Sequence, residues 1–284
     1  MTVGSGFGKE VAPAAFPATV EKQYGGGKNA KVAVDTGCLM HQCAYSVAPQ
    51  LFQGDCEPLA IAMVRRAVQL QKLGVHAIYV FDGARSPDKE SEDTKRSARR
   101  QAAIERLVVL QRGGDNMGEE ELREEIESQA RIAINIGWKA KREVMRGLLK
   151  ASFDVLVAPY EADHQCAYLQ ITGQVAAVMS VDYDMLTHGV SALITKFNFA
   201  NRGVSCLLYT HEKFAMWGSG KPLPHTTNFV LSLVGRLGPN KAFMLLSLVW
   251  KNDYSDFIPG IGRKKIEQIL RYAAGEKVCM PVHT

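Results

Sequence analysis

Four short apolar segments of this chain each run into acidic residues. They are KVAVD (31–35), HAIYVFD (76–82), VLVAPYEAD (155–163) and AAVMSVDYD (176–184). An ionised carboxylate is costly to bury unless a cation meets it, so acids that follow buried strands call for an explanation. Helical patterns separate the segments, and strands that alternate with helices form a mostly parallel sheet whose carboxyl ends share one edge. The sequence therefore predicts an α/β fold with helices on both faces of the sheet and an anionic edge.

The remaining elements follow from the spacing of the apolar positions. Strands are predicted at 31–35, 76–82, 155–159, 175–181, 192–197 and 204–209. Helices are predicted at 39–53, 57–73 (ended by Gly74), 86–112, 118–134, 138–150, 160–172 and 264–273, within a mainly helical chain from 211 onward. Residues 1–28 are rich in Gly, Ala and Pro and are expected to be loosely structured, with room for one short helix.

The composition excludes several classes of protein. The 284 residues suit one large α/β domain or two small ones, and no apolar run approaches the roughly 18 residues that span a membrane. The opening residues lack a basic region followed by an apolar core, so we expect no secretory signal. The six cysteines contain no CxxC pair, which indicates reduced thiols in an intracellular compartment and disfavours a zinc site. The net charge of +5 is mild, so an acidic edge implies positive charge elsewhere on the surface.

The acids suit hard divalent cations, which prefer carboxylate oxygens. Residues two apart in an extended segment project to the same side, and a pair of Mg²⁺ ions stabilises an in-line phosphodiester displacement. Each acid also has a simpler interpretation as a helix cap, a turn residue or a first-turn charge. Without metal we expect several of them to hold protons or to move. The candidate ligands are Asp35, Asp82, Glu161, Asp163, Asp182, Asp184 and Asp253.

Two further segments are candidates for nucleic-acid contacts. In the stretch 85–112 Lys89 and Arg96 share one helix face, and Arg99 and Arg100 continue near it. Those cations could hold a phosphate, although a solvated amphipathic helix is the alternative. The helix 118–134 reads as a solvated acidic face.

A glycine-rich turn near the end of the chain is the second such segment. The turn FIPGIGRKK (257–265) places two glycines before a helix, and their exposed amides could bind a phosphate oxygen, reinforced by the following cations. A plain capped turn is the alternative. The candidate residues are Gly260, Gly262, Arg263 and Lys264.

Several stretches together resemble one family. They are VAVDTGCLMHQCA, YVFDGARSPDKE, KRSARR, LVAPYEADHQCAYL, VDYDMLTHG and NDYSDFIPGIGRKK, which span residues 31 to about 272. The chain resembles the flap-endonuclease/XPG superfamily of structure-specific 5′ nucleases, most of all its eukaryotic exonuclease I branch. The resemblance implies a PIN-like nuclease core, a helical arch and a C-terminal helix–two-turn–helix element.

The resemblance also implies a role for each candidate residue. Asp35, Asp82, Glu161 and Asp163 correspond to ligands of one Mg²⁺, and Asp182, Asp184 and Asp253 to ligands of the other, with Mn²⁺ as a substitute. Lys89 and Arg96 correspond to the catalytic cations of the arch, and His41 to a residue that stacks on the substrate nucleotide. The Gly260–Gly262 turn corresponds to the duplex-binding element, with K⁺ as a candidate ion. The implied substrates are DNA 5′ flaps, nicks and recessed 5′ ends, which indicates a nuclear repair or replication enzyme.

The implied domain organisation is a divergent segment 1–30 followed by one nuclease domain, 31–284. Within it we expect an N-region at 31–113, the arch at about 84–134, and an I-region at 138–272 that includes the helix–two-turn–helix at about 240–272. Two departures stand out: the chain opens MTVGSGFG, and Gly37 stands where the family often has a bulky residue. The alternatives are a nuclease-fold scaffold that binds nucleic acid without cutting it, and a small four-acid ribonuclease.

Overall fold

The computed structural model describes residues 9–11, 31–84, 90–111, 117–200, 203–210, 233–249, 263–273 and 275. The chain divides into two compact units. The first unit contains Met1–Val34, Leu73–His76 and Asp163–Thr284, and the second contains Asp35–Lys72 and Ala77–Ala162.

The first unit carries strands in the order β1-β7-β6-β5-β2. The pairs β2–β5 and β5–β6 are parallel, whereas β6–β7 and β1–β7 are antiparallel. The side chains of β5 are all buried, and so are those of β2 after its first residue, as expected for strands covered on both faces. The bounds are β1 Lys9–Val11, β2 Lys31–Asp35, β5 Ala177–Met179, β6 Ala192–Ala200 and β7 Gly203–Thr210.

Helices complete the first unit. Helix α8 (Ala162–Ile171) precedes β5, and the 3₁₀ turn η5 (Tyr183–Leu186) follows it. Toward the end of the chain lie α11 (Pro239–Val249) and α12 (Arg263–Ala273). The apolar stripe of α12 buries Ile266 and Leu270, four residues apart on one face.

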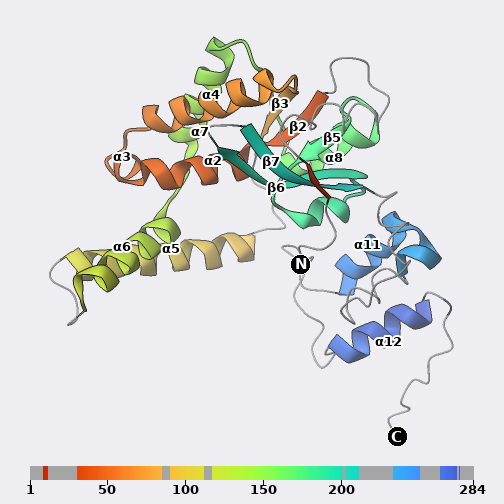
Figure 1. Ribbon diagram of the computed structural model, residues 1–284. Coiled ribbons are helices and arrows are strands. Elements are labelled where there is room, and N and C mark those ends of the chain that lie inside the picture. Colours follow the sequence, from red (N-terminus) through yellow and green to blue (C-terminus); the bar gives the residue numbers. More distant parts are fainter. Residues whose placement is uncertain are drawn as a thin grey trace, which may run out of the picture. The chain divides into compact units, whose positions relative to one another are not determined.

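The second unit is built on two parallel strands, β3 (His76–Phe81) and β4 (Asp154–Val157), with Ile78 opposite Asp154 and Phe81 opposite Val157. Helices α4 (Glu57–Lys72) and α7 (Trp138–Lys150) pack together through apolar stripes (Figure 1). Burying each large aliphatic side chain of these stripes contributes roughly 2 kcal/mol. The buried residues are Leu59, Ala60, Met63, Ala67 and Leu70 of α4 and Ala140, Val144 and Leu148 of α7.

The start of the second unit is helical. Helix α2 (Thr36–Ala44) follows Asp35 directly and continues through the 3₁₀ turn η3 (Tyr45–Val47) into α3 (Ala48–Phe52). Gly74, which follows α4, has φ +78°, the left-handed conformation that ends a helix most easily at glycine.

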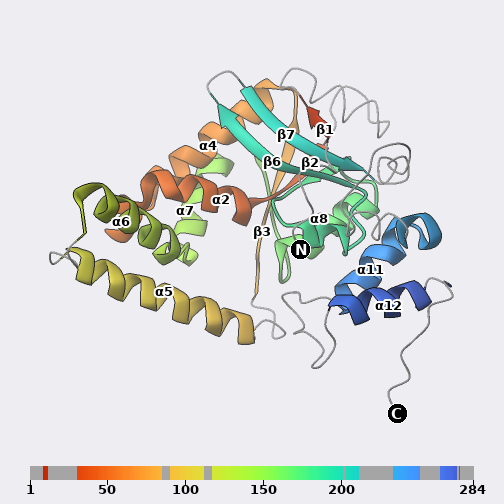
Figure 2. The same ribbon diagram turned by 60° about the horizontal axis from the view of Figure 1, so that its bottom comes forward.

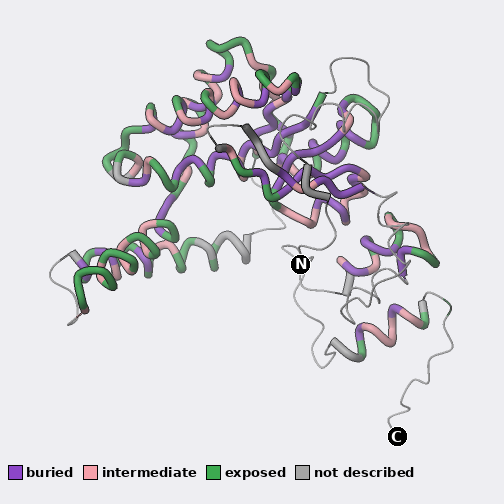
Figure 3. The backbone as a smooth tube through the Cα atoms, in the orientation of Figure 1, coloured by how far each residue is buried: buried purple, intermediate pink, exposed green. Residues whose placement is uncertain are grey.

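Two helices of the second unit form a hairpin. Helices α5 (Glu90–Gln111) and α6 (Glu119–Ala133) lie side by side (Figures 1 and 2). A small apolar cluster joins them, made of Ala103 and Leu107 from α5 with Ala133, Ile126 and Ala130 from α6. Figure 3 shows that most of α6 is exposed, and Ala133 is the one residue of that helix that is buried. This agrees with the solvated acidic face predicted for 118–134.

The predicted α/β class and mostly parallel sheet are confirmed, and the helix predicted at 138–150 coincides with α7. Strand β1 was not predicted, because it has three residues and forms only by pairing with β7 across most of the chain. The hairpin β6–β7 is longer than predicted and contains an irregularity between Thr195 and Asn198. The glycine turn at 257–262 and the segment 211–232 lie outside the described residues.

None of the described cysteines forms a disulfide; they are Cys38, Cys43, Cys56, Cys166 and Cys206. Among the described residues, no helix is both long enough and apolar enough to cross a bilayer.

Candidate functional site

Asp35, the first of the predicted metal ligands, ends β2 and begins α2. Its carboxylate is buried and accepts hydrogen bonds from the Cys38 amide (3.3 Å) and the Cys38 thiol (2.8 Å). Asp35 is therefore the N-cap of α2, as the simpler interpretation of the sequence allowed. The cap fixes the direction of the carboxylate, because both oxygens are bound to the first turn of the helix.

Asp82 follows β3 and is bound by two different elements. Its Oδ1 accepts from the Ala162 amide at 3.1 Å, so Asp82 caps the start of α8. Its Oδ2 accepts from the Lys141 ammonium group at 2.8 Å. Lys141 lies in the first turns of α7 and was not among the residues that the sequence singled out. Asp82 thus has a cationic partner that comes from a separate helix.

The chain around Asp82 is held by a close approach of the loops that follow β3 and β4. The Gly83 amide donates to the Tyr160 carbonyl at 2.6 Å, and the Ala84 amide donates to the Pro159 carbonyl at 3.0 Å. A Cβ atom at Gly83 would lie 1.9 Å from the carbonyl oxygen of Ala158. Only glycine fits there, so the sequence Asp82-Gly83 places the carboxylate beside the start of α8.

Gly37 marks a point that Asp35 and Asp82 both approach. A Cβ atom built at Gly37 would lie 3.3 Å from Oδ1 of Asp35 and 4.0 Å from Oδ2 of Asp82. The second unit therefore brings these two predicted ligands together. Residue 37, which lies beside both carboxylates, is a glycine.

The acids of the first unit sit around η5 and at the start of α8. Asp182 caps η5, because its Oδ1 accepts from the Asp184 amide at 2.8 Å. Its own amide donates to the buried Ser180 hydroxyl at 3.1 Å. Asp184 and Asp163 lie in the first turns of η5 and α8, and their side chains are partly buried, as is that of Glu161 in the second unit. These are the positions predicted for acids near helix starts.

Two histidines beside these acids were missed by the sequence reasoning. The rings of His164 and His188 lie with centroids 4.5 Å apart at 53°. His164 follows Asp163, and the His188 amide donates to the Asp184 carbonyl. Twenty-four positions separate the two histidines, so nothing in the local pattern could have paired them.

The predicted nucleic-acid contacts are placed in part. Arg99 is an exposed residue of α5, and His41 is an exposed residue of α2. Arg100 donates from Nη1 to Oδ1 of Asn135, in the segment between α6 and α7, at 3.1 Å. The side chain of Arg96 lies outside the described residues, although its backbone belongs to α5.

Several predicted residues lie outside what the structure describes. They are Lys89, Asp253, Gly260 and Gly262, together with the side chains of Arg263 and Lys264 at the start of α12. Their roles stay predictions.

The donor set fits a hard divalent cation rather than zinc, because Asp35 and Asp82 present carboxylate oxygens. Within the described ranges, no group of three or more His, Cys, Asp or Glu side chains is gathered closely enough to hold a metal ion. What the structure brings together in the second unit is a pair of carboxylates and one lysine. The charge on Asp82 is therefore met by a protein cation.

Two family models match the chain. The XPG N-terminal domain matches residues 13–103, and the XPG I-region matches residues 152–218. Asp35 and Asp82 fall in the first match, and Glu161, Asp163, Asp182 and Asp184 in the second. Helix α6 lies between the two matches, whereas α5 begins inside the first match and ends beyond it.

Curated relatives match over most of this chain. Exonuclease 1 of Xenopus laevis is 29% identical over 247 residues, which cover 87% of this chain and 30% of the relative. Flap endonuclease 1 of Dictyostelium discoideum is 27% identical over 275 residues, which cover 94% of this chain and 64% of the relative. The chain thus spans less than two thirds of the length of either relative.

Solved structures share the fold. The catalytic core of Rad2 in complex with DNA substrate superposes with a TM-score of 0.55 at 18% identity and covers 94% of this chain and 66% of that one. The Holliday junction-resolving enzyme GEN1 in complex with product DNA and Mg²⁺ gives a TM-score of 0.51 at 20% identity and covers 96% of this chain and 50% of that one. At these identities the likeness concerns the fold.

Proposed function

Because this chain belongs to the flap-endonuclease/XPG superfamily, we propose that it is a Mg²⁺-dependent, structure-specific 5′ nuclease that hydrolyses phosphodiesters in DNA. The observation that carries the proposal is the approach of Asp35 and Asp82 to one point, each fixed by a helix start. A buried carboxylate beside a second one is costly in a protein with no use for a cation there. Asp35 is buried although a neutral Asn or Ser could cap α2 equally well.

The acids are proposed to hold two Mg²⁺ ions, with Asp35, Asp82, Glu161 and Asp163 around one and Asp182, Asp184 and Asp253 around the other. When bound, such a pair of ions activates a water molecule and stabilises the leaving oxygen of an in-line displacement. Two basic residues of the chain are proposed to act on the phosphate itself. Lys89 and Arg96 would hold the scissile phosphate and offset its charge in the transition state.

Binding of the DNA is proposed to use the remaining cations. His41, Arg99 and Arg100 would contact the strand that is cut. Gly260, Gly262, Arg263 and Lys264 would hold the uncleaved duplex through backbone amides and charge, with K⁺ as a candidate ion. We propose 5′ flaps, nicks and recessed 5′ ends as the substrates; the name of the relative flap endonuclease 1 supports the flaps, and that of exonuclease 1 supports cutting from a strand end. The proposed place of this activity is nuclear DNA repair or replication.

A nuclease-fold scaffold that binds nucleic acid without cutting it is the second candidate. The observation that favours it is the ion pair between Lys141 and Asp82, because a protein that binds no metal at Asp82 needs a cation there. The two functions separate in a single cleavage assay.

The test uses 5′-flap, nicked and recessed duplexes, each labelled at both ends, with Mg²⁺ or with EDTA. We expect Mg²⁺-dependent cutting near the single-strand/double-strand junction, and loss of cutting in Asp182→Asn. The Asn side chain keeps the oxygen that accepts from the Asp184 amide, so η5 stays capped and only the charge is lost. Cutting in EDTA, or cutting that survives Asp182→Asn, would refute the mechanism, whereas tight binding without cutting would establish the scaffold.

The arch makes a separate prediction within the same assay. Lys89→Ala and Arg96→Ala should slow single-turnover cutting far more than they weaken binding of the duplex. An equal loss of both would show that these residues supply only general electrostatic attraction.

A further inference from the structure

Lys141 forms an ion pair with Asp82, one of the candidate metal ligands. Its ammonium group donates to Oδ2 of Asp82 at 2.8 Å, and its side chain is 25% exposed against 43% for that of Asp82. The two residues are 59 positions apart in the sequence, so the pair depends on the tertiary fold of the second unit. A pair formed by chance on a helix surface would join neighbours three or four positions apart.

The position of Lys141 in α7 is unfavourable for a lysine. The positive end of the helix dipole favours acids in the first turn, yet the first turn of α7 contains none. Lys141 still lies near that end, because its amide donates to the Gly137 carbonyl. A neutral residue there would avoid the repulsion from the dipole. The contact with Asp82 is the interaction that offsets this cost.

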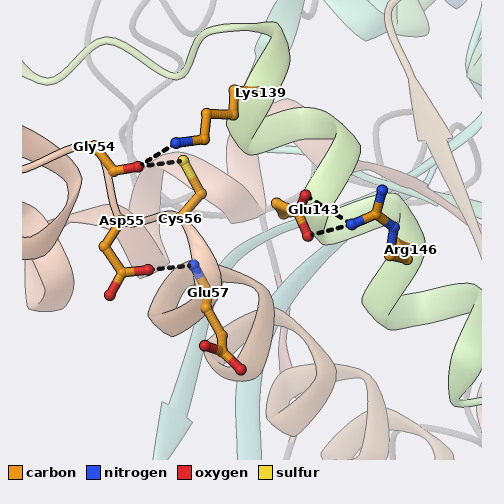
Figure 4. Close-up of polar contacts among 7 residues, drawn as sticks. All are labelled: Gly54, Asp55, Cys56, Glu57, Lys139, Glu143 and Arg146. Atoms are coloured by element: carbon orange, nitrogen blue, oxygen red, sulfur yellow. Dashed lines mark hydrogen bonds and ion pairs between the residues drawn. The ribbon is translucent and has the colours of Figure 1, made fainter.

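Lys139 on the same helix shows that a lysine near this end need not approach the acids. Its ammonium group donates to the Gly54 carbonyl at 2.7 Å, in the turn before α4 (Figure 4). Lys139 and Lys141 thus share a helix, a charge and a nearly equal distance from the helix start. They differ in that one binds a backbone carbonyl and the other binds the Asp82 carboxylate.

Both oxygens of Asp82 accept hydrogen bonds from the protein, Oδ1 from the Ala162 amide and Oδ2 from Lys141. A divalent ion that binds Asp82 meets the ammonium group as a like charge on the same carboxylate. We propose that Lys141 is a resident counter-ion, which holds Asp82 in the metal-free protein and competes with the divalent ion for it. The inference rests on the proposed metal-dependent function, and it gives this chain a weaker metal affinity than a neutral residue 141 would.

Direct measurement of Mn²⁺ binding to the full chain by electron paramagnetic resonance tests the competition without reference to activity. Lys141→Met keeps the apolar stem and removes the charge, and Lys139→Met is the matched control with the same change of net charge. Lys141→Met should bind Mn²⁺ roughly five- to tenfold more tightly than the wild type, the size expected for coupling between partly exposed charges. Lys139→Met should stay within about twofold, because a surface charge away from the site is screened.

Thermal unfolding gives a second readout. Without metal, Lys141→Met should lower the melting temperature more than Lys139→Met does, because it removes the ion pair with Asp82. Saturating Mn²⁺ should close that gap. In an Asp82→Asn background Lys141→Met should no longer cost stability, as a double-mutant cycle requires. Lys141→Gln provides the same comparison if the methionine variant does not fold, and Lys141→Arg should bind Mn²⁺ as the wild type does.

The outcomes separate this inference from the proposed function. Equal Mn²⁺ affinities in the wild type, Lys141→Met and Lys139→Met would overturn the counter-ion role while leaving the metal site in place. Weaker Mn²⁺ binding in Lys141→Met would overturn it as well, since Lys141 would then support the metal. If none of the three proteins binds Mn²⁺, the proposed function itself fails and the inference falls with it.

Discussion

Replacing Gly83 with alanine is the sharpest test of how the fold positions Asp82. The new Cβ atom would lie 1.9 Å from the Ala158 carbonyl oxygen and 2.8 Å from the Pro159 carbonyl oxygen, both of them backbone atoms that no side-chain rotation can move. Carbon–oxygen contacts begin near 3.3 Å, so one segment must shift by about 1.4 Å.

Such a shift acts on two hydrogen bonds at once. The Gly83 amide would lose its bond to Tyr160, and the Ala84 amide its bond to Pro159. Each loss costs about 1 kcal/mol, and the displaced backbone adds strain, so we expect Gly83→Ala to lower the free energy of unfolding by about 3–5 kcal/mol. The Asp82 carboxylate would also move away from the Ala162 amide and from Lys141.

Urea unfolding followed by circular dichroism measures the change. Gly235→Ala is the control, because nothing lies within 4 Å of the added Cβ atom and the residue is helical, where alanine is expected to be neutral or stabilising. A loss below about 1 kcal/mol in Gly83→Ala would refute the reasoning, since it would mean that the two loops separate at little cost.

Two further predictions concern buried groups away from the acids. Tyr79→Phe should raise the free energy of unfolding by about 1 kcal/mol in the same urea assay, because the buried Tyr79 hydroxyl has no hydrogen-bond partner among the described residues. The phenylalanine ring would keep the edge contact with Phe153. A loss of stability would contradict this prediction, since it would mean that the hydroxyl forms a hydrogen bond. Burial raises the pKa of the Cys206 thiol from 9.0 to about 12, so the folded protein favours the neutral thiol. The stability that the neutral thiol contributes should be complete below pH 9.0 and should fall as the pH rises toward 12. The expected slope is at most about 1.4 kcal/mol per pH unit. Cys206→Ala should flatten the alkaline limb of the unfolding profile, and an unchanged slope would contradict this origin.

The sequence predicted the elements with a strong local pattern. Helix α7 has apolar residues at Ala140, Val144 and Leu148, all on one face, and its predicted bounds coincide with the observed ones. Strand β1 has no such pattern, because three residues cannot show a period and its stability comes from pairing with β7. The local pattern therefore predicted a helix whose apolar residues lie on one buried face, and it missed a strand that depends on a distant partner strand.

The same division runs through the candidate site. Asp35 and Asp82 were found because each ends a buried strand, which is visible in the sequence. Lys141 was missed because its significance comes from Asp82, 59 positions earlier. The sequence held one clue to Lys141, which was an absence. The first turn of α7 has none of the acids that helix starts favour, and lysines stand near it instead. That the crowded acids hold protons or move without metal stays a prediction; at Asp82 the structure adds a lysine that pairs with the carboxylate.

Capping and metal binding make different demands on Asp35, and one pair of substitutions separates them. Asp35→Asn keeps an oxygen that can accept from the Cys38 amide, so α2 stays capped, while the charge beside Asp82 is removed. Asp35→Ala removes the cap as well, at about 1 kcal/mol. Without metal the Asn variant should therefore be at least as stable as the wild type and the Ala variant less stable. With Mn²⁺ the wild type should gain stability that neither variant gains. If the Asn variant without metal proves as unstable as the Ala variant, then the charge itself holds the fold, and a buried carboxylate at this position would need no metal ion to account for it.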